Sequence, residues 1–235
     1  MGLFKDKKLL VIAPHPDDEV LGCGGLIDRV VNDGGSVYVL IATVGYAKQY
    51  GSVSSPRLRL EETRQVMELL GVKDYEICLK DDEHHLRLDV MPQKQLIDLI
   101  ESGSKCSLDK IKPDIVAIPF AGYHQDHKAI FSAAFTACRP KPISLKVTPN
   151  TIITYEDSMS NWSENIFIPN FYVDITNSLD LKCQALSLYR SQQKLQDKEG
   201  LHFNSIETIK ALAKKRGREV AVEAAEAFML RRSLL

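Results

Sequence analysis

The sequence is poor in cysteine, in net charge and in long apolar runs. Only 5 of its 235 residues are cysteine, an odd number with no Cys-x-x-Cys pair. This pattern supports neither a disulfide framework nor a zinc site built from thiolates, and it indicates a reducing compartment. The 30 Lys and Arg residues nearly balance the 31 Asp and Glu residues, so the net charge is −1. A chain of this charge has no general field to attract nucleic acid, and we expect no nucleic-acid partner.

No apolar segment approaches the roughly 20 residues that a membrane-spanning helix needs. The first apolar run, residues 9–13, is too short for a secretion signal, and no small-residue cleavage site follows it. We therefore expect a cytoplasmic protein without a transmembrane segment. No linker rich in Pro or Gly divides the chain, which predicts a single domain over residues 1–235.

Short apolar runs rich in β-branched residues recur along the chain, with amphipathic segments between them. The runs cover residues 9–13, 37–42, 75–79, 114–118, 151–155 and 171–175. Runs that are apolar throughout are typical of strands covered on both faces. The intervening segments with a helical pattern are residues 20–32, 56–70, 86–102 and 127–138. We therefore predict an α/β, Rossmann-like fold with a mostly parallel sheet flanked by helices.

The last quarter of the chain has a helical pattern. Helices are expected over residues 179–195, 205–215 and 220–231, with a break at Gly217. The prediction is therefore a helical C-terminal segment on the same domain. In the first helix, Gly22-Cys-Gly24-Gly25 is expected to let the helix approach the sheet closely.

Two polar motifs follow two of the expected strands. Pro14-His-Pro-Asp-Asp-Glu19 comes after the first run, and His124-Gln-Asp-His127 comes shortly after the fourth. In open α/β sheets the reactive groups collect outside the carboxyl ends of the strands, so the two motifs can meet there. Two imidazoles and a carboxylate are the protein ligands that a catalytic zinc needs, with a fourth position for water. We predict His15, Asp18 and His127 as these ligands; the same set also suits Fe²⁺.

The other polar residues of the motifs have expected roles around that centre. Side chains of consecutive residues diverge, so Asp17 can face the water while Asp18 binds metal, and Asp17 is the candidate general base. His124 lies one helical turn from His127 and is the candidate oxyanion stabiliser or general acid. Asp126 is expected to orient a flanking histidine. The structural alternative is that Asp17 or Asp18 caps the following helix, but capping does not explain both motifs together.

At these residues the sequence resembles the PIG-L/LmbE family of zinc-dependent de-N-acetylases of N-acetylglucosaminyl conjugates, over nearly the whole chain. The family signatures (P/A)-H-P-D-D-E and H-x-D-H appear here as Pro14–Glu19 and His124–His127. The resemblance implies the same ligand and catalytic roles, adds Arg59 as a substrate contact, and makes Asp126 the partner of His124. It also implies a homo-oligomer, since family members are often multimeric. Many members carry Thr-x-Gly-Glu where this chain has Thr43-Val-Gly-Tyr46, so that Glu is missing or moved.

The expected function is metal-dependent removal of the N-acetyl group from an N-acetylglucosamine-type amino sugar or glycoconjugate. One alternative keeps the metal centre but acts on another small acyl amide, such as a thiol-linked glucosaminide. Another is a catalytically silent sugar-binding module, and an Fe²⁺ oxygenase is a poorer rival. Of the three remaining histidines, His84 and His85 are expected to be solvated loop residues, and His202 is expected to serve packing, with a place in the pocket as the alternative. Contacts from Asp82 and Tyr123 to substrate stay open.

Overall fold

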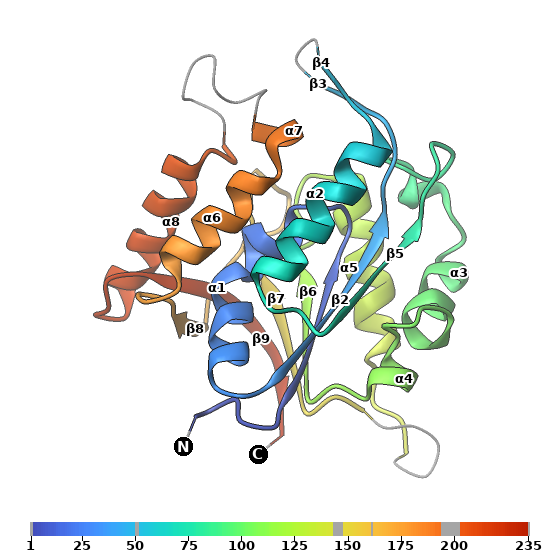
Figure 1. Cartoon of the computed structure of the whole chain (residues 1–235). Helices are drawn as coiled ribbons and strands as arrows, with labels where there is room; N and C mark the ends of the chain where they lie inside the picture. The colour runs from blue at the N-terminus through green and yellow to red at the C-terminus, as the bar shows by residue number, and fades with distance from the viewer. Residues whose placement is uncertain (1, 50–51, 143–147, 161, 194–202, 235) are drawn as a thin grey trace.

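The protein is built around a seven-stranded sheet between two layers of helices (Figure 1). The structure is a computed structural model that describes residues 2–49, 52–142, 148–160, 162–193 and 203–234. The sheet has the order β5-β2-β1-β6-β7-β9-β8. Its strands are β1 (Lys8–Ala13), β2 (Ser36–Thr43), β5 (Asp74–Leu79), β6 (Ile115–Pro119), β7 (Thr151–Tyr155), β8 (Phe171–Asp174) and β9 (Ala225–Ser233). A separate hairpin consists of β3 (Ala47–Gln49) and β4 (Ser52–Ser54).

The helices divide between the two faces of the sheet. One face carries α1 (Asp18–Asn32), α2 (Pro56–Leu69), α6 (Leu179–Leu188) and α8 (Ile206–Glu219). The other carries α3 (Gln93–Asp98), α4 (Leu108–Ile111) and α5 (Gln125–Ala137). A short helix, α7 (Arg190–Gln193), follows α6. Within the described part of the chain, no helix is both long and apolar enough to cross a membrane.

Strand β1 shows why the apolar runs predicted buried strands. Leu9 and Val11 pack into the core on the side of α1, and Leu10 and Ile12 pack into the core on the side of α5. Both faces of this strand are therefore buried from solvent, and its sequence is not expected to alternate between apolar and polar residues. The strands β5, β2, β1, β6 and β7 are mutually parallel, which confirms the predicted fold class.

The direction of the sheet reverses at β1. The chain passes from β1 through α1 to β2 on one side, and it later returns to β6 on the other side of β1. Such a reversal opens a crevice at the carboxyl ends of the two strands, because their connections leave over opposite faces. The two polar motifs begin just after these two strand ends, so the topology brings them together.

The expected helix over residues 220–231 is wrong, because this segment contains strand β9. A residue with left-handed backbone, Ala221 (φ 61°), follows α8 and turns the chain back. Strand β9 then runs antiparallel between β7 and β8, with Phe228 in one core and Ala227 in a small cluster on the other side. Alanine favours helix intrinsically, but pairing with two strands overrides that preference. The break at Gly217 is wrong as well, since α8 continues to Glu219.

The expected helix over residues 86–102 is also interrupted. Its place is taken by a 3₁₀ turn (Leu88–Val90), by α3 and by a π-helical turn (Leu99–Gly103). Pro92 stands immediately before α3, and Met91 has extended backbone (φ −73°, ψ 144°). The residue before a proline is restricted away from the helical region, which explains the break.

Helix α1 lies very close to the sheet at its glycines, as the sequence predicted. A Cβ atom on Gly22 would lie 2.1 Å from the Tyr155 ring of β7. Farther along, the Gly25 N–H donates to the Glu226 carboxylate of β9 (2.8 Å), and Lys182 of α6 donates to the Leu21 carbonyl (2.8 Å). Lys182 and Glu226 are themselves a buried ion pair (2.6 Å). These contacts fix the helix that begins directly at the first motif.

Candidate metal centre and active site

The loop after β1 holds Asp17 in an unusual backbone conformation. Asp17 has φ 103° and ψ −31°, and its side chain makes no capping hydrogen bond among the described residues, so the capping alternative is wrong for Asp17. Its backbone N–H instead donates to Glu19 Oε2 (3.1 Å), and the hydroxyl of Tyr189 donates to Glu19 Oε1. Strained backbone held by surrounding contacts is typical of functional sites.

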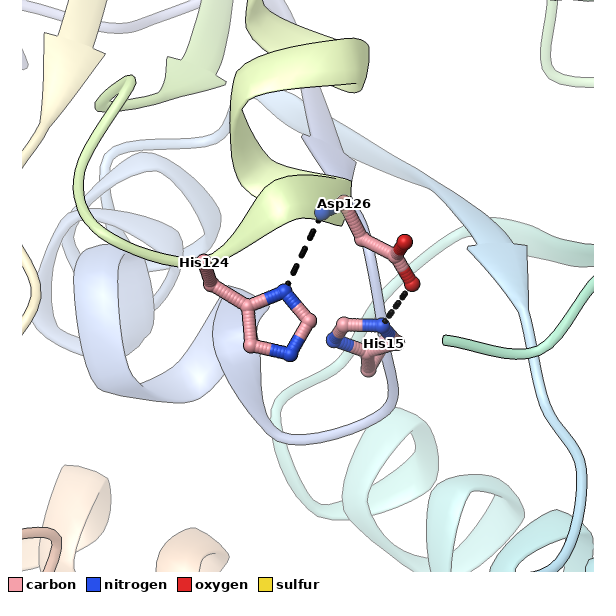
Figure 2. Close-up of side chains that lie close together, drawn as sticks. All are labelled: His15, His124 and Asp126. Atoms are coloured by element: carbon pink, nitrogen blue, oxygen red, sulfur yellow. Dashed lines mark hydrogen bonds and ion pairs between the residues drawn. The ribbon is translucent and has the colours of Figure 1, made fainter. Parts of the chain in front are cut away.

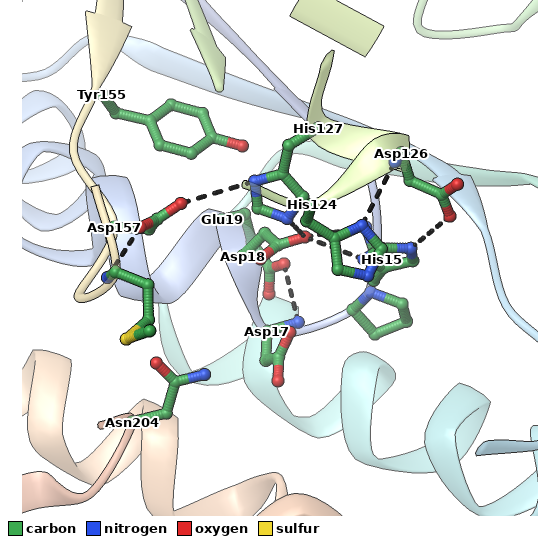
Figure 3. Close-up of polar contacts among 12 residues, drawn as sticks. His15, Asp17, Asp18, Glu19, His124, Asp126, His127, Tyr155, Asp157 and Asn204 are labelled. Atoms are coloured by element: carbon green, nitrogen blue, oxygen red, sulfur yellow. Dashed lines mark hydrogen bonds and ion pairs between the residues drawn. The ribbon is translucent and has the colours of Figure 1, made fainter. Parts of the chain in front are cut away.

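The three predicted ligands converge on one point (Figure 3). Asp18 Oδ2 lies 3.3 Å from His15 Nδ1 and 3.3 Å from His127 Nε2. All three side chains are buried, and their donor atoms lie within 4.8 Å of one another. Two imidazole nitrogens and one carboxylate oxygen form the donor set of a catalytic zinc, and equally of Fe²⁺. The structure therefore assembles a site whose chemistry fits such a metal.

Asp126 contacts the side chain of His15, whereas the resemblance implied His124 as its partner. Its Oδ2 lies 2.7 Å from His15 Nε2 (Figure 2). This is the ring nitrogen that does not face Asp18, and Oδ1 accepts the Leu88 N–H (2.9 Å). His124 meets Asp126 only through the backbone, because its Nδ1 accepts the Asp126 N–H (3.1 Å). A carboxylate that accepts the Nε2 proton of His15 leaves Nδ1 with a free lone pair facing Asp18.

Asp157 belongs to the site, although sequence reasoning missed it. It stands two residues after β7, and its Oδ2 lies 3.5 Å from His127 Nδ1. The signal was available, because β7 corresponds to the predicted strand 151–155, whose carboxyl end lies at the same edge of the sheet as the motifs. The next acidic residues along the chain, Glu156 and Asp157, were therefore candidates for this edge.

The pKa values of the two adjacent carboxylates of the first motif, Asp17 and Asp18, are shifted in opposite directions. Burial, and then the negative charge of Asp18, raise the pKa of Asp17 to about 7. For Asp18, burial acts in the same upward direction, but contacts with His127 and His15 outweigh it and hold its pKa well below the usual range. Carboxyls whose pKa values are separated in this way take different roles, one as a stable anion and one as a proton acceptor.

His124 is neutral at physiological pH. Burial, and then the neighbouring imidazoles of His15 and His127, lower its pKa to about 4. Since its Nδ1 accepts a backbone N–H, the proton of the neutral ring lies on Nε2. His124 therefore presents a hydrogen-bond donor and no positive charge at neutral pH.

Residues 10–138 match the family described as PIG-L, GlcNAc-PI de-N-acetylase. The chain belongs to the PIG-L family. The diacetylchitobiose deacetylase of Thermococcus kodakarensis is 31% identical over 207 residues, which cover 80% of this chain and 72% of that protein. Among solved structures, the N,N'-diacetylchitobiose deacetylase of Pyrococcus horikoshii is similar with a TM-score of 0.68 at 25% identity, covering 95% of this chain and 83% of that one.

The PIG-L fold is not restricted to one reaction. A 4-carboxy-2-hydroxymuconate hydratase from Pseudomonas putida KT2440 is similar with a TM-score of 0.74 at 19% identity, covering 97% of this chain and 98% of that chain. This likeness shows the fold alone. The reaction of this PIG-L chain must therefore be argued from the residues at its own site.

Arg59 and His85 form a buried pair beside the motif loop of this PIG-L chain. Arg59 donates from Nη2 to the Pro16 carbonyl (3.2 Å) and from Nη1 to His85 Nε2 (3.2 Å). The expectation that His85 is solvated is wrong, because only 5% of it is exposed and burial lowers its pKa to about 3. Gly45 explains the burial, since a Cβ there would lie 2.5 Å from His85 Cβ. His84 lies nearer the surface, beside Asp81 (2.7 Å).

These groups line one cavity of about 110 Å³ above the sheet edge. The imidazoles, Asp17, Asp18 and Arg59 line it together with other polar and apolar side chains. The latter include Tyr123, Met159, Gln192, Phe203 and Asn204. Asp82 does not line this cavity and accepts the Tyr46 N–H (2.7 Å), and His202 lies outside the described residues.

Proposed function

We propose that the protein is a metal-dependent hydrolase that removes the N-acetyl group from an N-acetylglucosamine-type amino sugar or its conjugate. One observation carries the proposal. Two imidazole nitrogens and a carboxylate oxygen converge beside a second carboxylate, Asp17, whose pKa is raised to about 7. Membership of the PIG-L family and similarity to proteins named as deacetylases support this reaction over others of the same fold.

His15, Asp18 and His127 would hold the metal, which we propose to be Zn²⁺, with Fe²⁺ as the alternative. Their contacts fit a cation, because two imidazole nitrogens and one carboxylate oxygen face the same point while His15 turns its other nitrogen to Asp126. When bound, such an ion acts as a Lewis acid on the acetyl carbonyl and acidifies a water.

The chain's own residues then move the proton and stabilise the developing charge. Asp17 accepts the proton of the attacking water, for which a carboxylate with raised pKa is well matched, and then delivers it to the departing amine. His124 donates its Nε2–H to the acetyl oxygen as negative charge develops there. The neutral state of His124 favours this stabilising role over that of a general acid.

The substrate is held by the wall of the same cavity. We propose that Arg59 donates to a hydroxyl of the sugar, because its guanidinium is fixed by Pro16 and His85 while it lines the cavity. Tyr123 lies at the rim with 41% of its surface exposed and is placed to contact a conjugate. We place the enzyme in the cytoplasm, since the five cysteines are all free.

Acetate release tests the proposed function. The purified protein is treated with a chelator, and release from N-acetylglucosamine, diacetylchitobiose and a thiol-linked glucosaminide is measured before and after Zn²⁺ or Fe²⁺ is restored. We expect release that is lost on chelation and regained with metal, and a preference for one of the three substrates that separates the amino-sugar proposal from its alternative. Sugar binding without acetate release at full metal occupancy would establish the silent binding module instead.

A further inference from the structure

The two histidines of the proposed centre are held differently. Each offers one ring nitrogen to Asp18 Oδ2 at 3.3 Å. The other nitrogen of His15 lies 2.7 Å from Asp126 Oδ2, a normal hydrogen bond. The other nitrogen of His127, Nδ1, is buried and has no hydrogen-bond partner among the described residues. The carboxylate that faces it is that of Asp157, at 3.5 Å.

A metal-bound histidine needs a partner at its second nitrogen. When Nε2 of His127 gives its lone pair to a cation, Nδ1 carries the proton and must donate it, because a buried donor left without an acceptor is destabilising. Hydrogen bonds of this kind are often long in the unloaded site and shorten when the site is filled. The separation of 3.5 Å places the Asp157 carboxylate at the outer limit of hydrogen-bond distance from Nδ1.

The loop after β7 holds Asp157 in place for this contact. Its Oδ1 accepts the Met159 N–H (2.8 Å) and the Ser160 hydroxyl (3.2 Å), and its own N–H donates to Ser160 Oγ (2.9 Å). One carboxylate oxygen is thus used by the turn, and Oδ2 is left facing His127 (Figure 3). Gly122 lies opposite, where a Cβ would come within 3.8 Å of Oδ2, so no side chain intervenes from that position.

We propose that Asp157 is a positioning residue of the metal centre, which accepts the Nδ1–H of His127 and holds its Nε2 toward the ion. The centre then has two carboxylate–histidine pairs, Asp126 with His15 and Asp157 with His127, and the second carboxylate comes from the loop after β7, outside both motifs. This inference rests on the proposed function for its metal but not for its reaction.

The test is the zinc affinity of Asp157→Asn, measured by competition with a chromogenic chelator. Asparagine has the same shape and keeps a side-chain oxygen for the turn, so a merely structural role predicts unchanged affinity. We expect binding weaker by about 10- to 100-fold, the range for loss of a carboxylate behind a metal-binding histidine. Asp126→Asn is the positive control. Ser160→Ala, which removes a turn contact but keeps the carboxylate, is the matched control and is expected to bind zinc as the unmodified protein does.

Thermal unfolding of each metal-free variant separates folding from binding. Unchanged unfolding of Asp157→Asn with weakened zinc binding supports the inference, and zinc binding equal to that of the unmodified protein overturns it. Equal weakening by Ser160→Ala would overturn it too, because the turn and not the carboxylate would then matter. Tight zinc binding without acetate release from any substrate would overturn the proposed function but would not contradict this inference.

Discussion

The two motif loops meet at one centre, but they are built in opposite ways. The loop after β1 contains strained backbone at Asp17 and two adjacent carboxylates with separated pKa values. The loop after β6 is relaxed, since His124 has ordinary extended backbone (φ −74°, ψ 130°) and accepts the Asp126 N–H at the start of α5. The proposed proton acceptor is therefore held at a cost in stability, whereas the proposed neutral donor is held by ordinary helix capping.

The largest effect is expected from Asp17→Asn. The change removes the proposed base, and general-base catalysis contributes about 10²- to 10⁴-fold, so we expect a loss of that size in kcat with zinc still bound. Steady-state acetate release and elemental analysis on the same sample check it. Full activity at full metal occupancy would show that another group takes the proton.

His124→Ala is expected to have the next largest effect. Removing one donor to a developing oxyanion lowers kcat by about 10²- to 10³-fold, with little change in KM because the contact strengthens only in the transition state. The pH profile should keep its shape, since His124 stays neutral down to about pH 4. If a limb of the kcat profile disappears in this variant, His124 acts as a general acid and the assignment is wrong.

Asp126→Asn tests how the loop after β6 orients His15 through the Asp126 carboxylate. Without the acceptor for His15 Nε2–H, the ring is no longer held in the tautomer that points a lone pair at Asp18. We expect about 10- to 100-fold weaker zinc binding, and activity that returns when excess zinc is added. Activity that stays low at saturating zinc would instead give Asp126 a role in the reaction itself.

The smallest effect is expected for the thermal stability of the metal-free protein when Asp17 is changed to Asn. The pKa of Asp17 is raised in the fold to about 7 from an ordinary 3.8, so the folded state binds its proton more tightly than the unfolded state. Its contribution to stability is therefore lost as pH rises from 3.8 toward 7. Asparagine avoids this loss and tolerates positive φ better than most residues.

We therefore expect metal-free Asp17→Asn to unfold a few degrees above the unmodified protein at pH 8, and the difference to shrink at pH 5. Thermal scans at several pH values measure it. If the difference in unfolding temperature is the same at every pH, the effect comes from backbone strain at Asp17. If Asp17→Asn is less stable than the unmodified protein, the loop after β1 does not lower the stability of the fold as inferred.

Much of the fold could be predicted because the burial of a segment is reflected in the apolar pattern of its own residues. Strand β1 is apolar at every buried position, and α2 begins at Pro56 after Ser55, whose hydroxyl accepts the Leu58 N–H (3.3 Å). The convergence of His15 with His127 could also be expected, since each follows a strand at the same edge of the sheet. Their spatial meeting needs only the strand order, not detailed packing.

The rest depends on contacts between segments far apart in the chain. β9 is a strand because β7 and β8 pair with it, and nothing in Ala225 to Phe228 alone excludes a helix. His85 is buried because Gly45 leaves space for it, which no motif encodes. The carboxylate of Asp126 turns to His15, 111 residues away, although His124 is its near neighbour in sequence.

The Glu226 contacts also bear on the order in which the chain is made. Glu226 accepts N–H groups of Gly25 and Leu26, which lie 201 and 200 residues earlier. During synthesis, the first motif and its helix therefore leave the ribosome about 200 residues before this anchor. The first motif therefore gains its final support only after β9 has docked. We expect a nascent or truncated chain that lacks β9 to remain inactive, although it already contains every proposed metal ligand.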